Sequence, residues 1–414
     1  MLLRRMATGI SRRELAKSAL GAMTAATVKG SAKRYAVIGA GVFGAWTAYH
    51  LRRGGHEVVL IDEYGPGNER ASSGGESRII RASYGKDEIY TRMAVRSLAL
   101  WDAFFARVGR QLLYRTGVLW IAKPGNVYAQ QSRDTLHRVG VEFEDLRPSD
   151  LRRRYPQIQV HEDDGAIFEP NSGALMARQA VQALVEQFVR DGGTYRHAAI
   201  ETPRGHGHLE RVVTAEGETI NADGFVFACG AWLKKILPDV LGSRIFPTRQ
   251  EVFFFGVPAG DRRFEPPQMP VWIDFGNERG MYGFPDLESR GFKVAFDLHG
   301  AEFDPDGGSR FASTEKIASA REYVSERFPA LTKAPIIGSR VCQYENTSNG
   351  DFLIDRHPGF ENVWIAGGGS GHGFKHGPAV GEYTAARVTG AAEPALEPRF
   401  SLLSKGKEQH RSVV

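Results

Sequence analysis

One of the two cysteines of the chain lies in a segment whose alternate residues suggest a reactive thiol. Arg340, Cys342 and Tyr344 point to the same face if the segment forms a strand, because strand side chains alternate. A nearby guanidinium stabilises a thiolate, which is the nucleophilic form of cysteine. The segment therefore indicates either a reactive thiol or a buried free cysteine, the ordinary role of an isolated Cys.

The first part of the chain after residue 33 has the pattern of a nucleotide-binding βαβ unit. An apolar strand over 34–38 leads into the turn 39–44, a helix over 45–53, and a strand over 57–61 that ends at Asp62. This strand–turn–helix context separates a GxGxxG fingerprint from a chance match. The unit predicts a bound dinucleotide, and an acid rather than an arginine at position 62 disfavours a 2′-phosphate.

Each glycine of this turn has its own expected role. Gly39 permits the tight turn, Gly41 lets the backbone approach a pyrophosphate, and Gly44 lets the helix pack closely on the strand. The helix N-terminus favours the phosphate charge, and Asp62 can accept hydrogen bonds from a ribose. The predicted nucleotide-binding residues of this region are Gly39, Gly41, Val42, Phe43, Gly44, Asp62 and, further along the chain, Ser73.

Two arginines follow the nucleotide unit in a glycine-rich stretch. Arg78 and Arg81 lie three residues apart around two isoleucines. A guanidinium pair can bind a carboxylate through two parallel hydrogen bonds. The pair therefore indicates a carboxylate clamp, with two surface arginines as the alternative reading.

The segment Phe292–Asp297 alternates strictly between apolar and other residues. Phe292, Val294 and Phe296 form one face, which is expected to pack in the core. Lys293 and Asp297 lie on the other face. That face is either exposed to solvent or the wall of a pocket, and the pattern alone does not decide between them.

A second glycine-rich loop follows an apolar strand over 363–366 and precedes a helix. Successive glycines free backbone amides to face negative charge, and the helix adds its dipole. A reduced flavin carries negative charge at its N1–C2=O edge, so this loop suits a flavin, and Cys342 becomes a candidate for covalent attachment. The alternative is a flexible glycine loop. The cofactor-binding residues predicted here are Gly368, Gly369, Gly371, His372, Gly373, Phe374 and Lys375.

Together with the GxGxxG turn, the motifs RIIR (78–81), RxCxY (340–344) and SGHGFK (370–375) resemble the monomeric sarcosine oxidase family of FAD-dependent amine oxidases, which includes N-methyltryptophan and pipecolate oxidases. The resemblance extends from Tyr35 to about Ala392. It implies an α/β fold with a glutathione-reductase-like, Rossmann-type FAD-binding domain and an inserted, mainly antiparallel β-sheet substrate domain. It also implies oxidation of the C–N bond of a secondary or N-alkylated amino acid to an imine, with O2 reduced to H2O2.

The resemblance also implies roles for single residues. FAD would be bound through an 8α-S-cysteinyl bond at Cys342, and the substrate carboxylate by Arg81 and Lys375. The remaining residues expected near the flavin or the substrate, and so predicted to be catalytic, are Lys293 (to assist the reaction of reduced flavin with oxygen), Arg78, Tyr282, Tyr344 and Asp297.

Asp297 departs from the pattern of the family, in which sarcosine oxidases commonly carry a histidine four residues after the lysine. The oxidation needs a neutral amine, yet a negative charge raises the pKa of a nearby amine. Asp297 is therefore expected to pair with Lys293, or to bind a hydroxyl or a second amine of a substrate other than sarcosine.

One βαβ unit of this kind is evident, so the nucleotide-binding domain is expected to be assembled from separate pieces. Strand-like runs concentrate in two stretches, 116–171 and 241–339, which form the predicted substrate domain. The other predicted parts are an FAD-binding domain from 33–115, 172–240 and 340–392, and a C-terminal tail over 393–414 that is expected to be mobile after Pro398.

The distribution of charge argues against nucleic acid as a partner and for an export signal. The whole net charge of +5 resides in residues 1–32, so the rest of the chain lacks a basic footprint. Ser11–Lys17 resembles the twin-arginine consensus, and the stretch after it is too short to span a bilayer. These features predict a twin-arginine signal peptide over 1–32 and a periplasmic protein, with a cytoplasmic protein as the alternative.

The expected partners are a small amine substrate and O2, and the chain is expected to be a monomer with no metal site and no membrane span. Two other functions stay open. A flavin-dependent dehydrogenase or deaminase of a primary amine would lack the oxygen reactivity that depends on Lys293. A non-catalytic flavin-binding protein would not need Arg81, Lys293, Tyr344 and Lys375 together.

Overall fold

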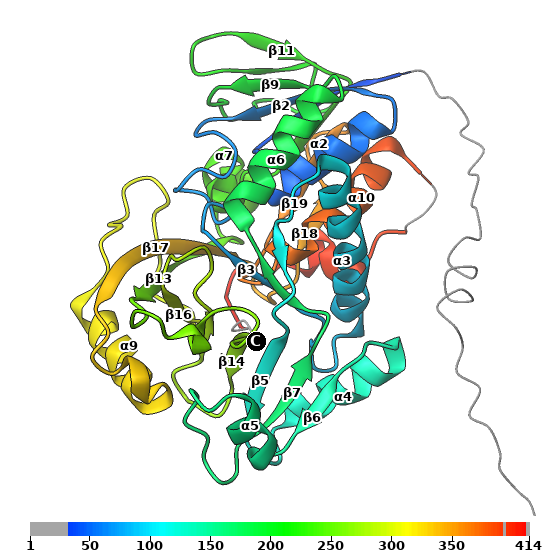
Figure 1. Ribbon diagram of the computed structural model, residues 1–414. Helices are drawn as coiled ribbons and strands as arrows, with labels where there is room; N and C mark the ends of the chain where they lie inside the picture. Colours follow the sequence, from blue (N-terminus) through cyan, green and yellow to red (C-terminus); the bar gives the residue numbers. More distant parts are fainter. Residues whose placement is uncertain (1–31, 392–394, 411–414) are drawn as a thin grey trace, which may run out of the picture. The chain divides into compact units, whose positions relative to one another are not determined.

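One parallel and one mainly antiparallel sheet position the site (Figure 1). The structure, a computed structural model, describes residues 32–391 and 395–410. The predicted signal peptide lies outside the described residues, apart from its last residue, Ala32. Both sheets belong to a compact unit that runs from Lys33 to Val414. The two kinds of sheet agree with the α/β fold class expected from the sequence.

The first sheet contains the predicted nucleotide-binding unit. Its strands pair in parallel, except for the edge strand β18, which is antiparallel to its neighbour. The interior residues of its four central strands are almost all buried and apolar, as expected for strands covered on both faces. In order of pairing the strands are β18 (Leu353–Arg356), β19 (Val363–Gly367), β12 (Gly224–Phe227), β1 (Arg34–Ile38), β2 (Glu57–Asp62) and β9 (Thr194–His197).

Four long helices accompany this sheet. Helix α2 (Val42–Arg53) contacts α6 (Ala177–Arg190) and α10 (Gly377–Thr389), and α10 contacts α3 (Glu88–Val108). Trp46 of α2 is 1% exposed, and its ring meets the edge of the Trp101 ring of α3. Helix α2 begins three residues before the start expected from the sequence, so the GxGxxG turn itself forms its first turn.

The second sheet is antiparallel except where β14 pairs with β5. Phe292, Val294 and Phe296 of β16 are buried in the hydrophobic cluster of this region, which confirms the predicted core face of that strand. In order of pairing the strands are β17 (Ile336–Asn346), β13 (Phe246–Phe255), β16 (Phe292–Phe296), β15 (Met281–Phe284), β14 (Val271–Asp274), β5 (Val118–Ala122), β7 (Gly165–Glu169) and β6 (Glu144–Leu146).

The long strand β17, which carries Cys342 and Tyr344, pairs with β13 and therefore belongs to the second sheet. The predicted domain boundary at 340 falls inside it, and the division of the chain into domains stays a prediction. In Figure 1, β17 forms a long gold arc beside β13 and helix α9 (Thr314–Arg327). Cys342 and Tyr344 thus reach the nucleotide-binding region from the other sheet.

Smaller elements complete the described part of the chain. Helix α4 (Val127–Val139) is capped by Asn126, whose side chain accepts from Ala129 N–H. The others are the three-stranded sheet β3 (Arg78–Ile80), β8 (Gly173–Leu175) and β4 (Leu113–Tyr114), the hairpin β10 (Arg211–Val213) and β11 (Thr219–Asn221), and the helices α5 (Pro148–Arg154), α7 (Leu233–Ile236) and α8 (Pro238–Leu241).

Part of the predicted C-terminal tail is packed. Arg399 pairs with Asp351 at 2.7 Å and with Asp87 at 3.1 Å, and Lys405 is 1% exposed. Expecting a mobile tail was therefore wrong for this stretch, because its polar composition did not reveal these distant partners. In the described ranges, no helix combines the length and the apolar surface that crossing a bilayer requires.

Candidate active site

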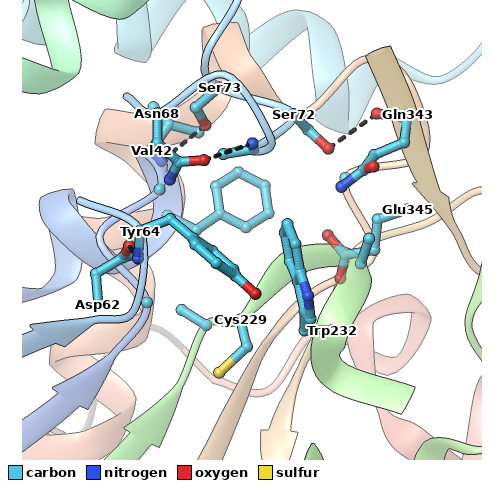
Figure 2. A pocket seen from close by; sticks show the side chains of 18 of the residues that line it. Val42, Asp62, Tyr64, Asn68, Ser72, Ser73, Cys229, Trp232, Gln343 and Glu345 are labelled. Carbon is cyan, nitrogen blue, oxygen red and sulfur yellow. Dashed lines mark hydrogen bonds between the residues drawn. The ribbon is translucent and has the colours of Figure 1, made fainter. Parts of the chain in front are cut away.

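A large cavity lies at the carboxyl ends of the parallel strands, the usual position of a nucleotide in such a sheet. It encloses about 1200 Å³, part of it open to solvent. Figure 2 shows Asp62 and Tyr64 on one side of it, and Gln343 and Glu345 from β17 on the other. The predicted residues that line it are Gly39, Gly41, Val42, Phe43, Asp62, Ser73, Arg78, Cys342, Tyr344, Gly369, Gly371, Gly373 and Phe374.

The glycine turn leaves backbone exposed to this cavity. A Cβ added at Gly44 would lie 1.9 Å from the carbonyl oxygen of Gly39, whereas one added at Gly41 would meet only Ser73 Oγ, at 3.6 Å. Helix α2 has no side-chain cap and no acid in its first turn, and Val42 N–H donates to Ser73 Oγ at 3.1 Å. An uncapped helix end with open space before it suits a phosphate group.

Asp62 holds the loop after β2 in place. Its carboxylate accepts from the backbone N–H groups of Ala40 at 2.7 Å, Tyr64 at 2.9 Å and Gly65 at 2.8 Å. Burial raises the pKa of this carboxyl, and the three donors oppose that rise. A carboxylate has about four acceptor positions, so capacity for a ribose hydroxyl remains.

Cys342 lies at the cavity wall beside an arginine, although not the one expected. Arg78 Nη2 donates to Cys342 Sγ at 3.4 Å, whereas Arg340 pairs with Glu76. The prediction that Arg340 acts on the thiol was therefore wrong. The two side chains do share a strand face, but residues two apart on a strand are about 6.6 Å apart, and Glu76 competes for the guanidinium.

A smaller pocket of about 570 Å³ adjoins the first. The two share four lining residues, Arg78, Tyr344, Gly371 and Phe374. One wall of the smaller pocket is apolar and includes Trp120, Phe275 and Phe284. The predicted residues found only in its lining are Arg81, Tyr282, Asp297, His372 and Lys375.

Arg81 and Lys375, the pair that the resemblance assigns to the substrate carboxylate (the clamp), both line this pocket. The Arg81 guanidinium lies over the rings of Tyr84 and Trp120, at 4.3 and 4.5 Å, and Lys375 Nζ donates to Tyr84 Oη and to the carbonyl of His372, both at 2.8 Å. Burial and the charge of Arg81 hold the pKa of Lys375 well below its usual value. A second cation in the same buried pocket disfavours the charged form of Lys375.

Asp297 follows β16 directly and lines the same pocket as Arg81 and Lys375. Tyr344 Oη donates to its carboxylate at 3.4 Å. Burial raises the pKa of Asp297 to about 6, while Arg81 and Lys375 oppose that rise. The undecided face of β16 is therefore a pocket wall at this end.

Lys293 is buried at the other end of the same strand face. Its Nζ donates to the carbonyl and hydroxyl oxygens of Ser77, at 3.0 and 3.1 Å, and lies 4.4 Å from the centre of the Phe284 ring. Burial and the charge of Arg78 lower the pKa of Lys293 to about 7. Of the two alternatives expected for Asp297, the pair with Lys293 is not formed, because four residues of strand separate the two by about 13 Å.

Three residues that the sequence reasoning did not select also line the large cavity. Glu345 accepts from Gly368 N–H at 2.8 Å, and burial raises its pKa to about 7. Trp232 packs on Tyr64, and Cys229 is partly buried at the cavity wall. Only the position of Glu345 beside the RxCxY motif could have signalled any of these. Gly368 itself supports the loop through Glu345 and does not line the cavity.

Comparisons with known proteins agree with this arrangement. A family model described as FAD dependent oxidoreductase matches residues 34–387. Monomeric sarcosine oxidase of Bacillus sp. (strain NS-129) is 31% identical over 360 residues, which are 85% of this chain and 92% of the relative. N-methyl-L-tryptophan oxidase of Yersinia pestis (strain Pestoides F) is 28% identical over 374 residues, 88% of this chain and 97% of the relative.

The crystal structure of L-proline dehydrogenase from P. horikoshii has the same fold. It aligns with a TM-score of 0.77 at 21% identity, and the alignment covers 90% of this chain and 97% of that one. The two-domain α/β fold expected from the sequence is thereby confirmed.

Proposed function

We propose, since the chain belongs to the FAD-dependent oxidoreductase family and is a relative of monomeric sarcosine oxidase, that it is an oxidase of secondary or N-alkylated amino acids. The family expected from the sequence motifs is confirmed. Relatives named for sarcosine and for N-methyl-L-tryptophan support an N-alkylated amino acid as the substrate class.

The residues of the large cavity fit FAD. The uncapped start of α2 and the open side of Gly41 would hold the pyrophosphate, and Asp62 the adenosine ribose. Gly369, Gly371 and Gly373 line this cavity, and Gly371 also lines the smaller pocket. These positions suit the negative edge of the reduced ring.

The observation that carries the proposal is that the large cavity adjoins the smaller pocket, which contains two cationic side chains. A group in the large cavity and a small molecule at Arg81 and Lys375 would both lie against the shared lining residues, such as Tyr344 and Phe374. FAD supplies the acceptor of two electrons from the C–N bond and passes them to O2. The clamp holds the substrate carboxylate and so orients the amine toward the flavin cavity.

Lys293 would supply positive charge for the reaction with oxygen. It is buried next to Arg78, which lines both cavities. A fixed cation in a site of low dielectric stabilises an oxygen anion as it forms. The removal of water by the aromatic wall makes that charge more effective.

The test of the function is a peroxide-coupled assay on N-methyl amino acids, pipecolate, proline and Amadori-type amines. Peroxide formed in step with substrate loss is expected for at least one of these classes. Anaerobic flavin reduction without peroxide in air would instead indicate a dehydrogenase. No reduction by any of them would refute the proposed function.

A covalent bond between FAD and Cys342 is the second part of the proposal. The position of Cys342 at the cavity wall, with Arg78 in contact with its sulfur, supports it. After acid precipitation, the yellow colour should stay with the wild-type protein and with Cys229→Ser, and should be released from Cys342→Ser. Release from the wild type would exclude the covalent bond.

Export by the twin-arginine route is proposed from the sequence alone, and N-terminal sequencing of periplasmic protein tests it. Loss of about 32 residues is expected. A mature protein that begins at Met1 would contradict it.

That the protein is a monomer remains a prediction, which analytical ultracentrifugation would test.

A further inference from the structure

The smaller pocket contains a carboxylate opposite two cations. Arg81 and Lys375 lie on the side formed by β3 and the loop before α10, and Asp297 lies on the side formed by β16 and β17. Among the described residues, Tyr344 is the hydrogen-bond donor to Asp297, and no lysine or arginine forms an ion pair with it. A buried carboxylate without an adjacent counter-ion is unfavourable, so this position suits a cationic ligand group.

We propose that Asp297 makes this pocket specific for substrates that enter as zwitterions, with the carboxylate at Arg81 and Lys375 and the ammonium group at Asp297. The inference rests on the proposed function, because it names the ionic form of that substrate. A pocket lined by one carboxylate and two cationic side chains is complementary to the two opposite charges of an amino acid. A plain carboxylic acid would satisfy the clamp and leave Asp297 unpaired.

Aromatic side chains add to the attraction for a substituted ammonium group. Tyr282 and Tyr344 line the pocket beside Asp297, and Phe275 and Trp120 lie on its apolar wall. Ring faces attract alkylated ammonium groups, and a carboxylate among such rings supplies the opposite charge. The pocket thus suits an N-alkylated ammonium better than a neutral group of the same shape.

Asp297 also resolves the conflict between binding a cation and oxidising a neutral amine. One N–H bond of the ammonium breaks, its proton forms an O–H bond on the carboxylate, and the amine keeps the electron pair. Once protonated, Asp297 no longer raises the pKa of the amine. The pKa of about 6 places this carboxyl close enough to neutrality to exchange a proton during turnover.

Two pairs of inert ligands test the selection, because the members of each pair differ only in charge. In the first pair, trimethylglycine is compared with 3,3-dimethylbutanoate. In the second pair, whose members are smaller, dimethylsulfonioacetate is compared with 3-methylbutanoate. Binding to the purified flavoprotein at pH 8 is followed through the flavin spectrum and by calorimetry. The wild type should bind the zwitterion of a pair about tenfold more tightly than the anion, as expected for one partly buried charge pair.

The order should reverse in Asp297→Asn, because the clamp charge is then uncompensated and favours the plain anion. Asp297→Glu should restore the preference for the zwitterion, and the exposed control Asp163→Asn should behave as the wild type. In the wild type the preference should disappear as pH falls through about 6, where Asp297 gains a proton in the presence of Arg81, Lys375, Tyr282 and Tyr344.

Equal binding of both members of a pair, or tighter binding of the anion by the wild type, would overturn the inference. An unchanged order in Asp297→Asn, with an intact flavin spectrum, would also overturn it. If none of the four ligands bound, both the carboxylate site at Arg81 and Lys375 and the inference would be refuted. Each of these results is separate from the peroxide assay, which decides the proposed function.

Discussion

The large cavity and the smaller pocket beside it differ in what their residues offer to a ligand. The large one depends on the absence of side chains, at Gly39, Gly41, Gly44 and the glycines after β19, and presents backbone to its ligand. The small one depends on buried ionisable groups, and burial displaces the pKa values of Asp297 and Lys375. A cofactor that stays bound requires a cavity of matching shape, whereas a substrate that is bound and released requires charged groups whose protonation can change. Adding atoms should therefore damage the first region, and removing charge should damage the second.

The largest effect is expected from removing the buried cation behind the small pocket. Lys293→Met should slow the reaction of reduced flavin with O2 by about 10²–10³-fold, because the developing anion loses its stabilising charge. Flavin reduction by substrate should change much less. Stopped-flow mixing of anaerobically reduced protein with O2 measures both, with the exposed Lys333→Met as control. Equal slowing of both half-reactions would show that Lys293 supports the structure of the site and has no specific role in the reaction with O2.

A smaller effect is expected at the clamp. Arg81→Gln should raise KM about 10²-fold, because a buried substrate carboxylate loses one of two cations. The flavin spectrum and the rate of reaction with O2 should stay as in the wild type. An unchanged KM would show that the substrate carboxylate binds elsewhere.

Within the large cavity, two substitutions of the same size should differ. Gly44→Ala should destabilise the fold by roughly 3 kcal/mol or more, because its Cβ would overlap the Gly39 carbonyl at 1.9 Å. Gly41→Ala, with its nearest neighbour at 3.6 Å, should cost about 1 kcal/mol or less. Denaturant unfolding and flavin content measure the difference. Equal stabilities would mean that the helix does not pack on the turn as described.

The smallest effect is the dependence of the oxygen reaction on pH. Since burial lowers the pKa of Lys293 to about 7, its cation is complete below that pH and is lost above it. The oxidative half-reaction should therefore be about tenfold faster at pH 6 than at pH 8. Lys293→Met should be flat over this range. A rate that rises with pH would contradict the sign of this charge effect.

Local patterns in the sequence predicted much of the site. The turn 39–44, the loop after β19 and the alternation of β16 depend on conformations and spacings within a few residues, and all three were located correctly. Family motifs added Arg81 and Lys375, which the structure brings together although 294 positions separate them. Glu345 was not selected, because it lies outside every motif and only its position beside RxCxY indicated it.

The amino-acid sequence by itself determined the nucleotide-binding turn and the residue types that could hold a flavin and a carboxylate, because glycine conformations and strand alternation are local properties. Only the tertiary structure decided that Arg78 rather than Arg340 meets Cys342, that Asp297 faces Arg81 and Lys375 rather than Lys293, and that β17 belongs to the second sheet. Those outcomes depend on pairing between strands and loops that lie far apart in the chain, and on competition between neighbouring charges, neither of which a local pattern specifies.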